Sequence, residues 1–105
     1  MATSSWLSDL AGFSAAADQP PTCDVWLFGS ALYRGRPPDL DVLIVYQDGS
    51  VADALAFRSR LAARGREADW PPFDFVTLSV AEEESVKFAI AEGAERVGHQ
   101  APSAS

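Results

Sequence analysis

Two short motifs, a Gly-Ser pair and an Asp-Leu-Asp triplet, constrain the fold of this chain more than any other part of its sequence. Gly29-Ser30 ends a run of high β-propensity, Cys23–Phe28, and Asp39-Leu40-Asp41 opens a second apolar run that ends at Tyr46. Side chains alternate along a strand, so Asp39 and Asp41 are expected on one face. The pattern predicts two strands whose connection carries a tight turn and two carboxylates.

A third aspartate occupies a comparable position in a later strand. Asp74 is the second residue of the predicted strand Phe73–Leu78. If this strand neighbours the one that starts at Leu40, then Asp39, Asp41 and Asp74 converge at one end of a sheet. Three carboxylates at close range repel one another, and a bound cation offsets that repulsion. Mg²⁺ prefers oxygen ligands and keeps substrate phosphates in its shell, so the three aspartates predict a magnesium site for phosphate chemistry, and two ions are expected in it.

The Gly-Ser pair and the loop after it predict a phosphate site beside these carboxylates. Gly29 permits a close backbone approach to a ligand, and the amides that follow, at the start of a helical turn, favour phosphate. The Ser30 hydroxyl can donate to a phosphate oxygen. Arg34 and Arg36 can clamp a triphosphate, although a purely solvated role for both arginines is the alternative. Each motif alone is typical of an ordinary turn or strand end, and their combination indicates nucleotide binding.

Periodicity and turn signals predict the remaining elements. Helices are expected over 4–17, after the cap Ser50, and after the capping box Ser79–Glu82. Gly65 is expected as the C-cap of the middle helix. Two inward stripes are expected on the last two helices: Ala54, Phe57 and Leu61, then Val86, Ile90, Ala94 and Val97. The order predicts an α/β (α+β) fold, a mixed three- to four-stranded sheet with flanking helices, mainly on one side.

Length, charge and cysteine content narrow the class of protein. The 105 residues predict one domain over 1–98 and a frayed, disordered tail over 99–105. The net charge of −7 argues against direct nucleic-acid binding and against an anionic membrane surface. Cys23 is the single cysteine and is expected to be a buried strand residue rather than a reactive thiol. No signal peptide or membrane-spanning run is expected, which favours a cytoplasmic location.

Taken together, these motifs resemble the nucleotidyltransferases of the DNA polymerase β-like superfamily. The short length and Ile90-Ala91-Glu92-Gly93 resemble its minimal nucleotidyltransferase (MNT) branch, and the resemblance spans about Cys23–Gly93. It implies the polymerase β-like nucleotidyltransferase fold and transfer of a nucleoside monophosphate, AMP in the first place, from ATP or another triphosphate to a hydroxyl. Asp39 and Asp41 match the metal ligands of the family, Asp74 its third carboxylate, and Gly29-Ser30 its phosphate-binding turn.

The MNT resemblance also implies a partner. Many MNT proteins are antitoxins paired with HEPN-domain ribonuclease toxins, and some attach AMP to a tyrosine of the toxin. The alternative is a catalytically silent antitoxin that acts by contact alone, which the acidic charge of this chain fits. A third reading, a toxin that nucleotidylates RNA, is disfavoured by the scarcity of basic residues. The chain has no room for an acceptor domain, so a protein partner or a second copy is expected to present the acceptor.

Overall fold

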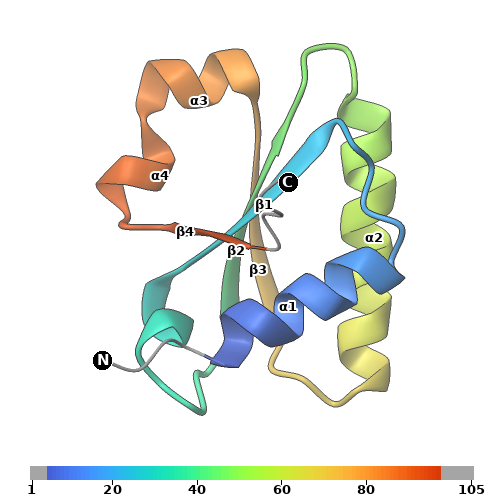
Figure 1. Cartoon of the computed structure of the whole chain (residues 1–105), viewed down its shortest axis with the longest axis vertical. Coiled ribbons are helices and arrows are strands. Elements are labelled where there is room, and N and C mark those ends of the chain that lie inside the picture. Colours follow the sequence, from blue (N-terminus) through green and yellow to red (C-terminus); the bar gives the residue numbers. More distant parts are fainter. Residues whose placement is uncertain (1–4, 98–105) are drawn as a thin grey trace, which may run out of the picture.

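A computed structural model describes residues 5–97, which form helices on both sides of one mixed sheet (Figure 1). The elements are α1 Ser5–Ala16, β1 Cys23–Phe28, the 3-10 turn η1 Gly29–Leu32, β2 Leu40–Tyr46, α2 Val51–Glu67, β3 Phe73–Ser79, α3 Val80–Val86, α4 Phe88–Ala91 and β4 Glu95–Val97. The mixed α/β class is confirmed. The predicted helix start at residue 4 and the predicted tail, 99–105, lie outside the described residues. Within 5–97, no helix has the length and apolar character needed to cross a membrane.

The strand order β3-β2-β1-β4 places the site-bearing strands at the centre and one edge of the sheet. β2 pairs antiparallel with β1 and parallel with β3, and β4 pairs antiparallel with β1. The parallel pair requires a long crossover, which α2 supplies. α2 returns the chain to the starting end of β2, so β2 and β3 begin at the same end of the sheet.

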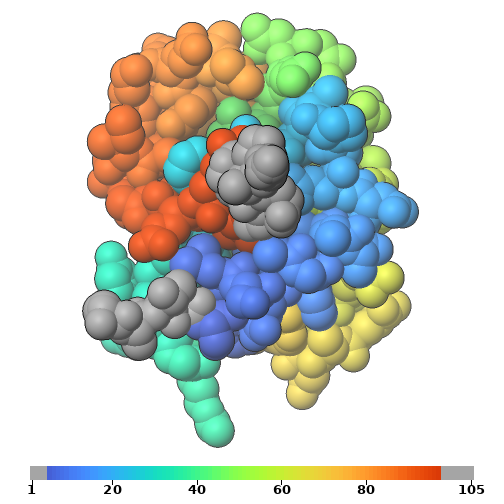
Figure 2. All heavy atoms as spheres, viewed as in Figure 1, coloured from blue at the N-terminus to red at the C-terminus, as the bar shows by residue number. Residues whose placement is uncertain are grey.

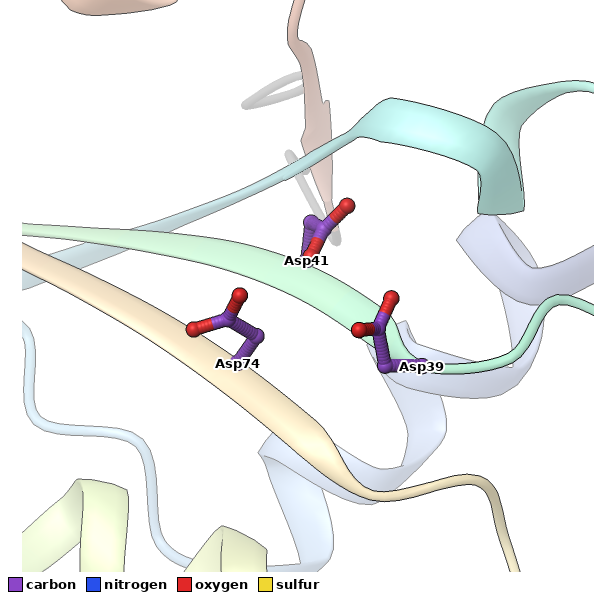
Figure 3. Close-up of side chains that lie close together, drawn as sticks. All are labelled: Asp39, Asp41 and Asp74. Carbon is purple, nitrogen blue, oxygen red and sulfur yellow. The ribbon is translucent and has the colours of Figure 1, made fainter.

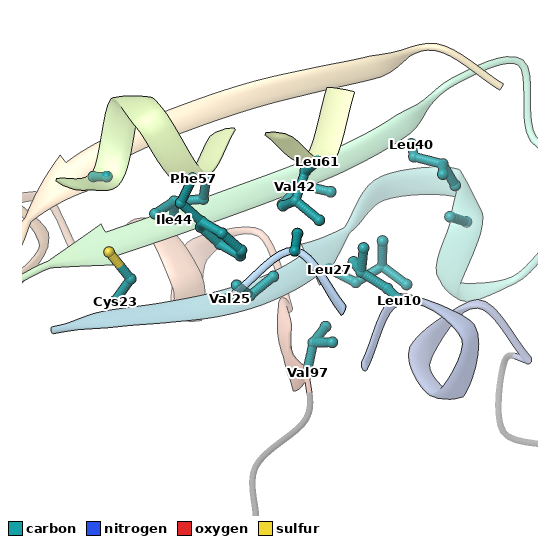
Figure 4. Packing of buried hydrophobic residues seen from close by; sticks show 13 residues of the cluster. Leu10, Cys23, Val25, Leu27, Leu40, Val42, Ile44, Phe57, Leu61 and Val97 are labelled. Carbon is teal, nitrogen blue, oxygen red and sulfur yellow. The ribbon is translucent and has the colours of Figure 1, made fainter. Parts of the chain in front are cut away.

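Both faces of β2 are buried, as its uninterrupted apolar run predicts. Val42 and Ile44 belong to the main core, which lies between the sheet and helices α1 and α2 (Figure 4). Leu43 and Val45 belong to a smaller cluster on the other face, where Ala89 of α4 covers them. The two long helices, α1 and α2, therefore lie on one face, as expected, and the short helices α3 and α4 lie on the other.

The stripe predicted for α2 is confirmed. Ala54, Phe57 and Leu61 are fully buried in the main core. Cys23 is buried in the same core, and burial raises the pKa of its thiol, partly opposed by a hydrogen bond with Thr22. This is the inert strand residue that the sequence predicts, because a raised pKa keeps the thiol protonated.

The single last helix predicted after Ser79 is wrong, because the chain forms two short helices and a strand. The capping box of Ser79 and Glu82 is present, but Lys87 adopts a left-handed conformation, φ 55°, and ends α3. The Glu83 carboxylate then accepts from the amides of Phe88 (3.2 Å) and Ala89 (3.1 Å) at the start of α4. The break stabilised by Glu83 turns the following residues away from a continuous helical path.

The stripe predicted for that last helix is accordingly wrong as well. Val86 and Ile90 are 57% and 80% exposed rather than inward-facing. Val97 is buried, but it lies in β4 opposite Val25. Ala94 is half-buried against the smaller cluster.

Gly65 is not a C-cap, because α2 continues to Glu67 and is capped by Ala68. Gly65 is buried, and a Cβ built there would lie 2.7 Å from Phe73 Cε2. Gly65→Ala is therefore expected to destabilise the fold by about 1–3 kcal/mol through overpacking, despite the better helix propensity of alanine.

Gly12 in α1 provides the matched control for this prediction. A Cβ at Gly12 would meet no atom within 4 Å, so Gly12→Ala is expected to stabilise by about 1 kcal/mol. Urea unfolding of both variants measures the two effects. A stabilising Gly65→Ala would contradict the close packing of α2 on Phe73.

Candidate metal and nucleotide site

The structure brings together the three aspartates that the sequence places at strand starts (Figure 3). Asp41 of β2 and Asp74 of β3 are direct neighbours in the parallel pair, and Asp39 lies two residues before Asp41. Each offers one carboxylate oxygen, and these oxygens lie within 4.8 Å of one another. Asp39 and Asp41 are half-buried and Asp74 is exposed, so the cluster is open to a ligand on one side. An all-oxygen donor set of this size suits Mg²⁺.

Asp41 lies in an unfavourable electrostatic position for a carboxylate. Burial raises the pKa of the Asp41 carboxyl, and the negative charges of Asp39, Asp74 and Glu92 raise it further. All of these effects disfavour the charged form of Asp41. A divalent cation reverses this, because it attracts each carboxylate that the others repel.

Gly29 places the Gly-Ser turn directly against Asp41. Its φ is +76°, in the region that side chains disfavour, and a Cβ built there would collide with the Asp41 carboxylate. The register explains this contact, because Phe28 is paired with Asp41 across β1 and β2. The turn predicted to bind phosphate and the carboxylates predicted to bind metal therefore share one end of the sheet.

Ser30 lies in η1, the turn that follows Gly29. Its carbonyl accepts from the amides of Tyr33 (3.0 Å) and Arg34 (2.9 Å), which closes the turn. Phe28 at the N-cap supplies no side-chain hydrogen bond to the turn. The indole of Trp6 donates to the carbonyl of Gly35 (3.2 Å), so α1 holds the loop that leads to β2.

Arg34 and Arg36 are exposed on that loop. Within residues 5–97 neither forms an ion pair with the three carboxylates. The loop that carries both arginines leads into the start of β2, at the same end of the sheet as the carboxylate cluster. Their contact with a triphosphate stays a prediction.

Glu92 is a fourth acidic residue near the cluster, and the sequence reasoning did not assign it to the site. The turn that carries it is held against β1: the ring of Phe88 meets that of Phe28 edge-on at 5.0 Å, and Glu95 pairs with Leu27. From this turn the Glu92 charge contributes to the raised pKa of Asp41. The available signal was its place in Ile90–Gly93, the segment that resembles the MNT branch.

Comparisons of the chain with models of protein families, with curated proteins and with solved structures give no match. The resemblance to MNT nucleotidyltransferases therefore rests on the motifs. The geometry adds a separate argument, since it does not depend on the resemblance: three carboxylates converge beside a glycine turn.

Proposed function

We propose that this protein is a Mg²⁺-dependent nucleotidyltransferase of the polymerase β-like type. It transfers a nucleoside monophosphate, AMP in the first place, from a nucleoside triphosphate to a hydroxyl group. The observation that supports this most directly is the cluster of Asp39, Asp41 and Asp74 against Gly29. Their oxygens suit Mg²⁺, and glycine lets the turn lie directly against the Asp41 carboxylate, so a phosphate bound to the amides of the turn would lie beside the metal ligands.

The residues at this end of the sheet would bind the metal ions and the triphosphate. Asp39, Asp41 and Asp74 would hold one or two Mg²⁺ ions, which supply positive charge to the attacking and leaving oxygens. Gly29 and Ser30 would bind the phosphates through backbone amides and the Ser30 hydroxyl. Arg34 and Arg36 would hold the far end of the triphosphate. Asp74, the exposed member of the cluster, would hold the catalytic metal and help to activate the acceptor.

The reaction balances without any further reactant. The acceptor oxygen forms a bond to the α-phosphorus, and the bond from that phosphorus to the bridging oxygen breaks. Pyrophosphate leaves with the electron pair, and the hydroxyl proton passes to a carboxylate or to water. The acceptor we propose is a tyrosine of a HEPN-type toxin in the cytoplasm, which makes the protein an MNT-type antitoxin. A silent antitoxin that acts by contact is the competing function.

Nucleotide binding is expected to require Mg²⁺ and the aspartates. Calorimetric titration with ATP, GTP, CTP and UTP should show binding of ATP with Mg²⁺ and loss of binding when the metal is chelated. The double variant Asp39→Asn, Asp41→Asn should bind at least about a hundredfold more weakly, because it loses two anionic ligands. Glu84→Gln, an exposed change on α3, is the control. If no triphosphate binds the wild type, the contact-only function is favoured.

Transfer itself is tested with labelled ATP and a candidate HEPN-type toxin. Labelling of the toxin is expected with the wild type and should fall by at least about two orders of magnitude with the double aspartate variant. Equal labelling by that variant would contradict the metal mechanism. Under the contact-only function the variant should still neutralise the toxin in cells.

A further inference from the structure

The segment from Val80 to Glu92 presents apolar side chains to solvent on the face of the sheet that also carries the carboxylate cluster. α3 buries none of its residues, and Val86 and Ile90 are 57% and 80% exposed. This segment forms part of the molecular surface in Figure 2, where it is orange. We call the exposed side chains of Val80, Glu84, Val86, Ile90 and Glu92 the α3–α4 surface. Several large apolar side chains exposed on one short segment are typical of a docking surface.

The α3–α4 surface reaches the end of the sheet that carries the carboxylates. Phe88, between Val86 and Ile90, packs edge-on against Phe28, the residue before Gly29. Ala89 anchors α4 on Leu43 and Val45 of β2. At the end of this segment, the Glu92 carboxylate acts on Asp41 through its charge. Because Leu43 and Val45 share a face of β2 with Asp41, α4 lies on the side of the sheet that carries the carboxylates.

The charge of the segment indicates what kind of molecule fits. It carries four glutamates against Lys87 alone. Glu82 and Glu83 are engaged within the segment, with the amides of Ser79 and of Phe88 and Ala89. Glu84 and Glu92 remain exposed, and the aspartate cluster adds further negative charge. A complementary molecule is basic with an apolar part.

We propose that the α3–α4 surface docks a basic, partly apolar segment of the protein acceptor and so delivers its hydroxyl to the carboxylates. This inference rests on the proposed function and names the class of its acceptor. A second copy of the chain does not fit, because a two-fold contact through this surface would bring two acidic surfaces together.

Synthetic peptides test the proposal without a natural partner. Two fluorescein-labelled peptides are used, each with one tyrosine and two leucines, flanked by arginines in one and by glutamates in the other. Fluorescence anisotropy without ATP is expected to show the arginine peptide binding at least about tenfold more tightly at low salt, with the preference falling as salt rises. Equal binding of the two peptides would overturn the proposal.

Matched variants separate docking on this surface from general attraction to an acidic protein. Ile90→Ser and Glu92→Gln should each weaken binding of the arginine peptide about three- to tenfold. Leu55→Ser, 41% exposed on α2, and Glu67→Gln, exposed at the end of α2, remove the same kinds of group on the other face of the sheet and should leave binding unchanged. Losses as large with the two control variants as with the α3–α4 variants would reject the surface.

A parallel measurement of AMP transfer to the same peptides keeps the two proposals distinct. Binding that depends on Ile90 and Glu92, without transfer by the wild type, would support the surface and count against the chemistry. Transfer to both peptides at equal rates, unchanged in Ile90→Ser and Glu92→Gln, would support the chemistry and overturn the docking proposal.

Discussion

Gly29→Ala is expected to lower the free energy of unfolding by about 2–4 kcal/mol and to abolish nucleotide binding. Alanine at a φ of +76° costs about 1 kcal/mol, and the clash of its methyl group with the Asp41 carboxylate adds about 1–3 kcal/mol. Relief of the clash would displace either the turn or the carboxylate, and both are needed for the proposed site. Urea unfolding and calorimetry with Mg²⁺ and ATP measure the two effects.

Gly49→Ala is the control for the Gly29 prediction. Gly49 has a similar φ of +88°, but a Cβ there would meet no atom within 4 Å, so a cost of about 1 kcal/mol is expected. The difference between the two variants isolates the contact with Asp41. Adding Asp41→Ala to Gly29→Ala should restore part of the lost stability, since neighbouring substitutions are not additive. Equal costs at both glycines would contradict the close approach.

Asp41→Asn is expected to have opposite effects with and without metal. The folded structure raises the pKa of Asp41 by burial and by the charges of Asp39, Asp74 and Glu92. The folded protein thus holds this proton more tightly than the unfolded chain does. The resulting stability is fully present below the unfolded pKa and is lost as the pH rises through the folded pKa. At neutral pH without metal, asparagine removes an unfavourable charge, so the variant should be more stable than the wild type.

Mg²⁺ should reverse that order. At a concentration about a hundred times its dissociation constant it should stabilise the wild type by about 2.7 kcal/mol and the variant by much less. Unfolding curves of both proteins, in chelator and in Mg²⁺ over a pH series, give the comparison. Asp48→Asn, which removes an exposed charge at the other end of β2, should change neither quantity. A wild type that gains no stability from Mg²⁺ would count against the metal site.

Local signals in the sequence were sufficient to predict the part of the fold that carries the aspartates. The apolar run from Leu40 to Tyr46 is buried on both faces because helices pack on both sides of the sheet. The capping box at Ser79 and the stripe through Phe57 on α2 are also local patterns, and both are present. The convergence of Asp39, Asp41 and Asp74 needed one further assumption, that the strands starting at Leu40 and Phe73 are neighbours.

The C-terminal part of the domain could not be predicted because long-range contacts override its helical pattern. Val86, Ile90, Ala94 and Val97 fit one helix by spacing, yet Val97 pairs with Val25 as a strand. That pairing covers the edge of β1, which would otherwise expose unpaired backbone groups. The amides of Phe88 and Ala89, which the break at Lys87 leaves without helical partners, donate to the Glu83 carboxylate instead. The role of Glu92 was missed for the same reason, since this fold brings it toward Asp41.

The packing of Phe73 and Phe75 has a consequence for Asp74, which lies between them. Both rings face α2 and stack at 5.0 Å, and Phe73 also meets Trp70 at 6.1 Å. A slip of β3 by one residue would turn Asp74 toward α2 and expose both rings. These aromatic side chains therefore lock the register of β3 that puts the third carboxylate on the correct side of the sheet. A substitution of either ring that allowed β3 to shift its register would remove Asp74 from the site without changing any of the three aspartates.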